Sequence, residues 1–413
     1  MQHRSLSALD LASEAARRSV SYERRRALPV LVKPRKLNVW SFMKESIGKD
    51  LSRVSTPITF NEPLSMLQRF CEDLEYAQLL VKAESVQDSC LRTAFIACFV
   101  ISQYSSSANR QCKPFNPLLG ETFDFKQEEE GGWGEEEGKG GRWRWVSEQV
   151  SHHPPISACY ADSPIFEYFG QYEPKNKFTG KDMEVTPRGT LHIKLKKWNE
   201  EYTFTKATSS LHNLIVGKMY VDNHGTVYVK NHCSGEQAKI TLMKKGGWFG
   251  DRAHEVQASI TTAGGEERYK LHGKWTEEVV LEDVQAQTRE VVWTRHELPP
   301  NHVEMYHFSR FGITLNEITE EMRDSLPPTD CRFRPDQRLY ENGEVKAAAK
   351  EKLRLEDKQR KARKQRESAG EKWTPRWFEL KENSTTCKEE WTYKGTYWNV
   401  RETRQYEDLP DIF

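Results

Sequence analysis

The sequence predicts an α+β protein in which a large antiparallel β-structure lies between two helical regions. Between Trp143 and Trp293 apolar and polar residues alternate in short segments such as GTLHIKLKK and AKITLMKK, which turn residues separate. Strands at this spacing without intervening helices indicate an antiparallel barrel or sandwich. Before and after this region, apolar residues recur at helical spacing, which predicts the flanking helices.

Composition and charge exclude several classes of protein. The 413 residues include 62 Lys and Arg and 61 Asp and Glu, so attraction to nucleic acid or to an anionic membrane must come from local patches. No apolar run approaches the roughly 20 residues that span a bilayer. The eight cysteines form no C-x-x-C pair and no signal peptide precedes them. We therefore expect a soluble, cytoplasmic protein without a metal or cofactor.

The first part of the chain predicts a lead-in, an amphipathic piece and two helices. Residues 1–36 carry basic clusters without an apolar face, which favours a weakly ordered linker. From Leu37 a short stretch has helical spacing and is either a detachable flap or an ordinary packed helix. Asn61 is the predicted cap of a helix that runs to about Leu80, and Asp88 the predicted cap of the next.

Turn residues organise the chain around the predicted sheet. In KPFNPLLGETF, from Lys113 to Phe123, two prolines and a glycine leave Lys113 and Asn116 on a rigid turn that can position a cation. Residues 127–141 are acidic and glycine-rich, which predicts a flexible excursion between strands. Residues 222–225, DNHG, predict a tight hairpin turn. Because a barrel of many strands is too wide for side chains to fill, we expect an apolar tunnel that holds a lipid.

The last part of the chain predicts helices and a packed tail. A strongly helix-forming segment starts at about Glu344, and Lys352, Glu356 and Arg360 recur every four residues on one of its faces. This helix is either a solvated, salt-bridged helix or one whose basic end attracts phosphates. The tail contains Trp373, Trp377, Trp391 and Trp398, and so many aromatic residues predict that it packs back on the barrel.

The stretch SEQVSHHPP, Ser147 to Pro155, is the strongest candidate for a binding site. Pro154 and Pro155 hold the two histidines on a stiff backbone, where a nearby phosphate could convert either ring into a cationic double donor. Adjacent residues of a strand point to opposite faces, so the pair is a poor metal chelate. A hydrolase built on Ser151 is a weaker alternative because the chain has no G-x-S-x-G elbow.

Four stretches together resemble the oxysterol-binding protein family: EQVSHHPP, KPFNPLLGETF, LNVWSFMKESIGKDLSRV and KEKLRLEDKQR. FNEPLSMLQR and the terminal PDIF look most similar to the founding member of the family. The resemblance implies an incomplete antiparallel β-barrel that encloses a lipid tunnel, with an N-terminal lid and flanking helices. The implied lipid-binding domain spans 37–413, with a lid at 37–57, helices at 58–110, a β-barrel at 111–300 and C-terminal helices and tail at 301–413.

The resemblance also implies roles for individual residues. His152, His153, Lys113 and Arg360 would hold the 4-phosphate of phosphatidylinositol 4-phosphate, and Asn116, Lys352 and Glu356 would contact its inositol ring or bridging phosphate. The lid would present these apolar side chains: Trp40, Phe42, Met43, Ile47 and Leu51.

The implied function is lipid transfer rather than catalysis. Such a protein carries one sterol and exchanges it for phosphatidylinositol 4-phosphate between membranes, as a peripheral protein at contacts between the endoplasmic reticulum and the Golgi. The alternatives are a cytosolic lipid sensor or scaffold and the hydrolase. Nucleic-acid binding by the C-terminal basic helix is disfavoured because four acidic residues between positions 344 and 366 offset part of its charge.

Overall fold

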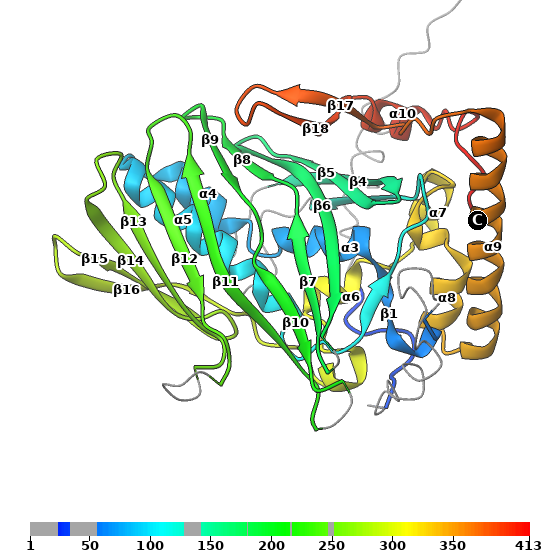
Figure 1. Ribbon diagram of the computed structural model, residues 1–413, viewed down its shortest axis with the longest axis horizontal. Helices are drawn as coiled ribbons and strands as arrows, with labels where there is room; N and C mark the ends of the chain where they lie inside the picture. Colours follow the sequence, from blue (N-terminus) through cyan, green and yellow to red (C-terminus); the bar gives the residue numbers. More distant parts are fainter. Residues whose placement is uncertain (1–23, 34–55, 128–141, 180, 215–216, 247–251) are drawn as a thin grey trace, which may run out of the picture.

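The computed structural model describes residues 24–33, 56–127, 142–179, 181–214, 217–246 and 252–413. One long, curved antiparallel sheet dominates the fold, and helices lie in its hollow and at one end (Figure 1). This arrangement confirms the predicted α+β class with a large antiparallel sheet. The strands are β1 Asn61–Ser65, β2 Lys113–Phe115, β3 Thr122–Gln127, β4 Trp143–His152, β5 Pro155–Asp162, β6 Phe166–Phe178, β7 Met183–Arg188, β8 Leu191–Leu195, β9 Glu200–Phe204, β10 Thr208–His212, β11 Tyr220–Asn231, β12 Gln237–Leu242, β13 Glu255–Thr261, β14 Glu267–Lys274, β15 Glu278–Asp283, β16 Thr288–Thr294, β17 Phe378–Asn383 and β18 Lys388–Tyr393.

The order of the strands shows that the sheet is open. It runs β16-β15-β14-β13-β12-β11-β10-β7-β6-β5-β4-β3, with β8 and β9 bridging β6 and β11. Within the described residues, the end strands β3 and β16 do not pair with each other. The insertion at 128–141 joins the paired strands β3 and β4, so its predicted place between strands is confirmed.

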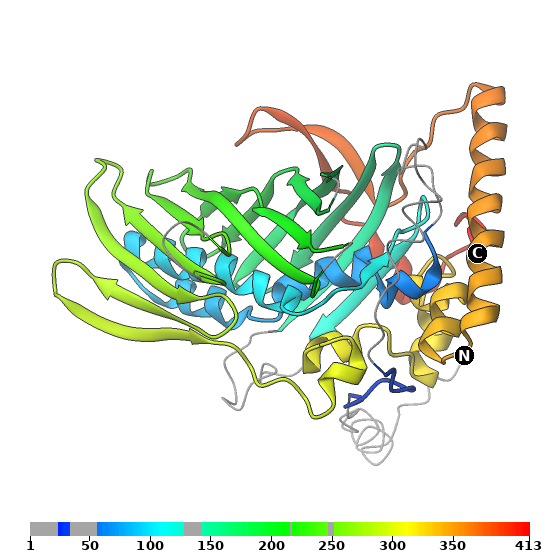
Figure 2. The same ribbon diagram turned by 60° about the horizontal axis from the view of Figure 1, so that its bottom comes forward.

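Short helices surround the sheet, and one long helix closes the end next to β4 and β5 (Figures 1 and 2). The α-helices are α3 Met66–Cys71, α4 Gln78–Ser85, α5 Ser89–Ser102, α6 Arg310–Thr314, α7 Glu320–Ser325, α8 Pro335–Glu341, α9 Val345–Ala369 and α10 Tyr397–Thr403. The 3₁₀ helices are η2 Ile58–Phe60, η3 Glu72–Leu74, η4 Gln103–Ser107, η5 His302–Met305 and η6 Cys331–Phe333.

Helix α5 forms the centre of the core. It lies in the hollow of the sheet (Figure 2), where twelve of its fourteen residues are buried and nine of these belong to one hydrophobic cluster with side chains of the strands. Asp88 caps it as predicted, because its carboxylate accepts a hydrogen bond of 3.0 Å from the Leu91 N–H. This cap satisfies one of the N–H groups that every helix start leaves unpaired.

The predicted cap at Asn61 is wrong. Asn61 begins strand β1, and its side-chain amide donates to the Pro114 carbonyl at 3.0 Å instead of capping a helix. Helix α3 starts later, where Ser65 and Gln68 form a reciprocal capping box. The single helix expected up to Leu80 is divided into α3, η3 and α4.

The predicted hairpin at 222–225 is also wrong, because β11 passes straight through it. His224 still pairs with Thr208 of β10, whereas Gly225, with φ of 111°, pairs with Leu242 of β12. The strand therefore changes partner at this glycine, whose backbone conformation other residues rarely adopt. Turn-forming residue types here mark a change of pairing rather than a reversal of the chain.

The C-terminal prediction is confirmed in its main features. Helix α9 starts one residue after Glu344. The tail packs back on the sheet, as Figure 1 shows for β17, β18 and α10. Its buried residues share a small core with β4 and β5; the members are Val146, Val150, Ala158, Trp377, Phe378, Tyr397 and Trp398.

The described part of the N-terminal region lies against the C-terminal helices. Leu28 is buried in the main core, and the Arg25 guanidinium donates to the Ile313 carbonyl at 2.7 Å and to Glu341 at 2.6 Å. Residues 34–55 lie outside the described residues. The predicted lid side chains Trp40, Phe42, Met43, Ile47 and Leu51 belong to that segment.

Candidate phosphate-binding site

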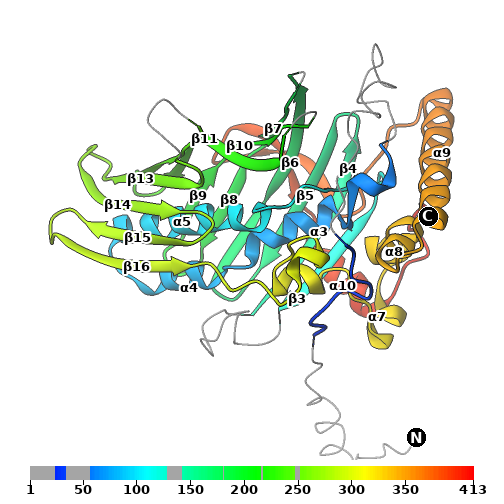
Figure 3. The ribbon, with the colours of Figure 1, turned by 90° about the horizontal axis from the view of Figure 1, so that it is seen from below.

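The two histidines lie where β4 ends beside helix α9 (Figure 3). The β4–β5 hairpin turns tightly, with His152 paired to Pro155. His152 is partly buried and His153 is exposed, and their ring centroids are 4.6 Å apart. The prolines thus hold two imidazoles at one corner of the sheet, as the motif predicted.

His152 is tied to α9 by a residue that the sequence did not single out. The side-chain amide of Gln359 lies 2.7 Å from His152 Nε2, and its oxygen accepts a hydrogen bond of 2.9 Å from the Leu119 N–H. The pKa of His152 is lowered to about 4. Burial is the largest cause, and the neighbouring His153, Arg363 and Arg334 act in the same direction. In the empty site His152 is therefore neutral near pH 7, not readily cationic as the sequence suggested.

Lys113 lies on β2 facing the middle of α9. Burial lowers the pKa of its ammonium to about 8, and the Lys352 charge adds to this effect while the Glu356 carboxylate opposes it. Lys352 is buried, and its ammonium lies 2.5 Å from a Glu356 oxygen. The structure thus brings Lys113, Lys352 and Glu356 together, as the sequence predicted for one site.

Asn116 and Arg360 are placed differently from the rest of the predicted set. Both side chains are exposed, and Arg360 forms an ion pair of 2.7 Å with Asp357. Residues spaced by four drift by about 40° per step around a helix. Arg360 is therefore turned about 80° away from Lys352, and its contact with a ligand stays a prediction.

Arg334 is a further residue of the site that sequence reasoning missed. It is buried, and it donates to Asp336 at 2.7 Å, to Glu121 at 2.9 Å and to the Asn116 carbonyl at 2.7 Å. These bonds hold the proline-bounded turn that carries Lys113. No pattern in the sequence indicates Arg334. Gln359, in contrast, lies three residues after Glu356 and seven after Lys352, and this helical spacing could have identified Gln359 as part of the site.

The acidic residue of the motif holds the tail. The Glu148 carboxylate accepts hydrogen bonds from the backbone N–H groups of Arg376 and Trp377, at 2.8 and 2.9 Å. Burial raises the pKa of this carboxyl to about 7, although the two bonds act in the opposite direction. Glu148 therefore fixes the strand that ends in the histidines rather than contacting a ligand.

A second group of polar residues lies inside the sheet. Gln103 is buried beside the Tyr168 hydroxyl, and neither polar atom of its amide makes a well-aligned hydrogen bond in the described part of the chain. Asp73 accepts a hydrogen bond of 2.7 Å from the Tyr168 hydroxyl and also binds Lys206. Because an unpaired buried amide is costly, Gln103 is suited to bind a polar group of an enclosed ligand.

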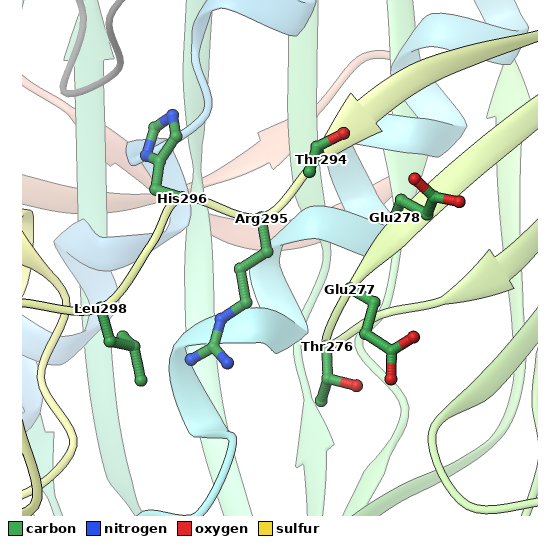
Figure 4. A pocket seen from close by; sticks show the side chains of 7 residues that line it. All are labelled: Thr276, Glu277, Glu278, Thr294, Arg295, His296 and Leu298. Atoms are coloured by element: carbon green, nitrogen blue, oxygen red, sulfur yellow. The ribbon is translucent and has the colours of Figure 1, made fainter.

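A separate cavity of about 360 Å³ lies beside the β14–β15 turn (Figure 4). The Arg295 guanidinium points into it between Leu298 and Thr276, and Glu277 and Glu278 contribute carboxylates to its wall. These acidic groups oppose an anion there. The cavity is formed by strands far along the sheet from α9.

Other predicted alternatives find little support. Ser151 makes no hydrogen bond to His152 among the described residues, so the two do not form a nucleophile and base. The same residues contain no group of three or more His, Cys, Asp or Glu side chains that could hold a metal ion. No helix among them is long and apolar enough to cross a membrane.

Comparison with known proteins identifies the family. The model of the family "Oxysterol-binding protein" matches residues 38–402. Human oxysterol-binding protein-related protein 7 is 39% identical over 389 residues, which are 94% of this chain and 44% of that protein. Protein 1B of Arabidopsis thaliana is 38% identical, over 94% of this chain and 77% of its own length. The chain thus spans less than half of the human relative.

Solved structures show the same architecture. The Osh1 ORD domain in complex with cholesterol superposes with a TM-score of 0.86 at 33% identity, covering 99% of this chain and 100% of that one. The Osh3 ORD of Saccharomyces cerevisiae in complex with PI(4)P gives 0.80 at 33% identity, covering 95% and 99%. The similarity to the founding member stays a prediction. The chain belongs to the oxysterol-binding protein family.

Proposed function

We propose that this chain binds one lipid at a time, either a sterol or phosphatidylinositol 4-phosphate, and exchanges the two between membranes. The observation that carries the proposal is a set of basic groups along helix α9: Lys113 of β2 lies near Lys352, and His152 at the end of β4 contacts Gln359, seven residues further along the same helix. The similar Osh1 and Osh3 domains, with cholesterol and PI(4)P respectively, support the same pair of ligands.

A phosphate monoester is a suitable ligand for this cluster. It carries about −1.5 to −2 charges at neutral pH and needs several cationic donors when it leaves water. Lys113 and Lys352 are close enough to lower the pKa of Lys113, so the empty site stores a repulsion that an anion relieves. In our proposal Lys113, His152, His153 and Arg360 hold the 4-phosphate, and Asn116, Lys352 and Glu356 contact the inositol ring or the bridging phosphate.

The sterol occupies the apolar interior of the sheet. Its hydroxyl binds Gln103, directly or through water, which gives the buried amide the partner that it lacks. The acyl chains of the phosphoinositide fill the same interior while its headgroup remains at the histidines. The two lipids therefore exclude each other, and exchange follows from competition for one volume.

The protein acts at membrane surfaces because both ligands reside in bilayers. It associates with them peripherally and transiently in our proposal, at organelle membranes such as those of the endoplasmic reticulum and the Golgi. The exposed basic residues near the end of α9, including Lys361 and Lys364, favour anionic membranes.

Lipid transfer between liposomes tests the headgroup assignment. His152→Ala with His153→Ala should abolish extraction of phosphatidylinositol 4-phosphate and leave sterol extraction intact. His232→Ala with His272→Ala is the matched control, because it removes one histidine from the turn after β11 and one from β14, both away from α9. Extraction of the phosphoinositide by the first variant at the wild-type rate would show that the assignment is wrong.

A further inference from the structure

The orientation of the Gln359 amide is fixed by its surroundings. Its oxygen accepts the Leu119 N–H at 2.9 Å, and a backbone N–H can only donate. The opposite orientation would place two donors against each other. The NH₂ group therefore faces His152 Nε2 at 2.7 Å and donates to it.

This contact determines where His152 carries its proton. A ring nitrogen that accepts a hydrogen bond bears no hydrogen, so the proton of the neutral ring is on Nδ1. Nδ1 is buried, and the Pro117 carbonyl is the backbone acceptor beside the ring that favours a proton on it, although the two make no well-aligned hydrogen bond. Nε2 is thus the ring nitrogen that faces α9.

The groups facing His152 oppose a second proton in the empty site. They are the His153 ring from β4, Arg363 from α9, Arg334 from the segment before α8 and the amide hydrogens of Gln359. Only the Pro117 carbonyl acts in the other direction. A doubly charged phosphate beside Nε2 would reverse this balance, because it attracts the same cations and accepts a hydrogen bond from Nε2.

We propose that Gln359 occupies, in the empty site, the position on His152 Nε2 that the ligand phosphate takes, so that the phosphate displaces this amide and His152 gains a proton. The inference rests on the proposed function. One proton from solvent is added to Nε2, Nδ1 keeps its own, and the imidazolium donates Nε2–H to a phosphate oxygen. Gln359 keeps the Leu119 bond and acts as a positioning residue that holds His152 neutral until the ligand arrives.

The number of protons taken up when the ligand binds can be predicted from the groups in the site. At pH 7 a lysine with a pKa of about 8, as Lys113 has, is already about 90% protonated and takes up at most about 0.1 proton. The ligand phosphate, whose second ionisation lies near pH 6, releases about 0.1 proton when it becomes fully charged. These contributions nearly cancel, and any proton that His153 takes up is common to the wild type and to a variant changed at His152 alone, so the two proteins should differ by close to one proton per ligand.

Calorimetry of the whole chain with dioctanoyl phosphatidylinositol 4-phosphate, in buffers of different ionisation enthalpy, measures this uptake. Uptake that is larger by about one proton per ligand in the wild type than in His152→Gln supports the proposal. Binding without uptake, or equal uptake by both proteins, overturns it and leaves the proposed function standing. No binding by the wild type overturns both.

A second variant separates displacement of the amide from general effects. In Gln359→Glu the carboxylate still accepts a hydrogen bond from the Leu119 N–H, and it also accepts one from a protonated Nε2. His152 is therefore already charged before the ligand binds. Proton uptake should be about one proton per ligand smaller than in the wild type and affinity should drop at least several-fold, while Gln365→Glu, an exposed position of the same helix, behaves as the wild type. Unchanged uptake and affinity in Gln359→Glu would overturn the proposal. So would ¹⁵N spectra of the ligand-free protein that place a proton on His152 Nε2.

Discussion

The lowered pKa of Lys113 makes headgroup binding depend on pH above neutrality. With a pKa of about 8 in the empty site, Lys113 is about 90% protonated at pH 7 and about 10% at pH 9. A bound phosphate raises this pKa, so affinity falls as pH rises through the value of the free protein. The share of this loss that is due to Lys113 approaches a factor of about ten between pH 7 and pH 9, or about 1.4 kcal/mol, because the phosphate itself stays doubly charged over this range.

Lys113→Arg isolates this contribution. Arginine remains charged at both pH values, whereas every other titrating group, His152 included, is common to the two proteins. Between pH 7 and pH 9 the dissociation constant for the short-chain phosphoinositide should therefore rise by a factor about ten times larger in the wild type than in the variant. Sterol affinity should not change with pH in either protein. Equal pH dependence of headgroup binding in the two proteins would refute the role given to Lys113.

Three further changes test the fold and the interior. Lys113→Met should stabilise the ligand-free protein at pH 7 by on the order of 2 kcal/mol in urea unfolding and should abolish headgroup binding. A lysine whose pKa is lowered by folding destabilises the fold at every pH below about 8, and this effect fades as pH rises from there to the pKa of the unfolded chain. An unchanged unfolding midpoint would contradict the burial of Lys113. Asp88→Ala should cost about 1 kcal/mol through loss of the α5 cap, measured in the same way, and an unaltered free energy of unfolding would contradict this role. Gln103→Leu should weaken sterol binding about tenfold without weakening phosphoinositide binding, since it removes one hydrogen bond from the interior and leaves α9 untouched; equal losses for both lipids would place Gln103 outside the sterol site.

Features that depend on long, regular patterns could be predicted from the sequence. The alternation from Trp143 to Trp293 predicted the sheet, and the run of helix formers after Glu344 predicted α9. Local capping chemistry predicted the role of Asp88. The same kind of reasoning failed at Asn61, because its amide binds the carbonyl of Pro114, a residue distant in sequence.

The candidate site was predictable in its residue types and less so in its chemistry. The motif and the family resemblance pointed to His152 and Lys113, which lie at the ends of different elements beside one helix. The neutral state of His152 depends on burial and on Gln359, and Gln359 matters because the Leu119 N–H orients its amide. Such a relation exists only in the folded chain, where the turn, the strand end and the helix meet.

Native mass spectrometry of the protein with both lipids supplied tests the central claim of exchange most directly. If a sterol and phosphatidylinositol 4-phosphate compete for one interior, each protein molecule carries one or the other, and raising the phosphoinositide concentration converts the sterol complex into the phosphoinositide complex. The variant with His152→Ala and His153→Ala should keep its sterol under the same conditions. A wild-type species that holds one molecule of each lipid at once would contradict the account.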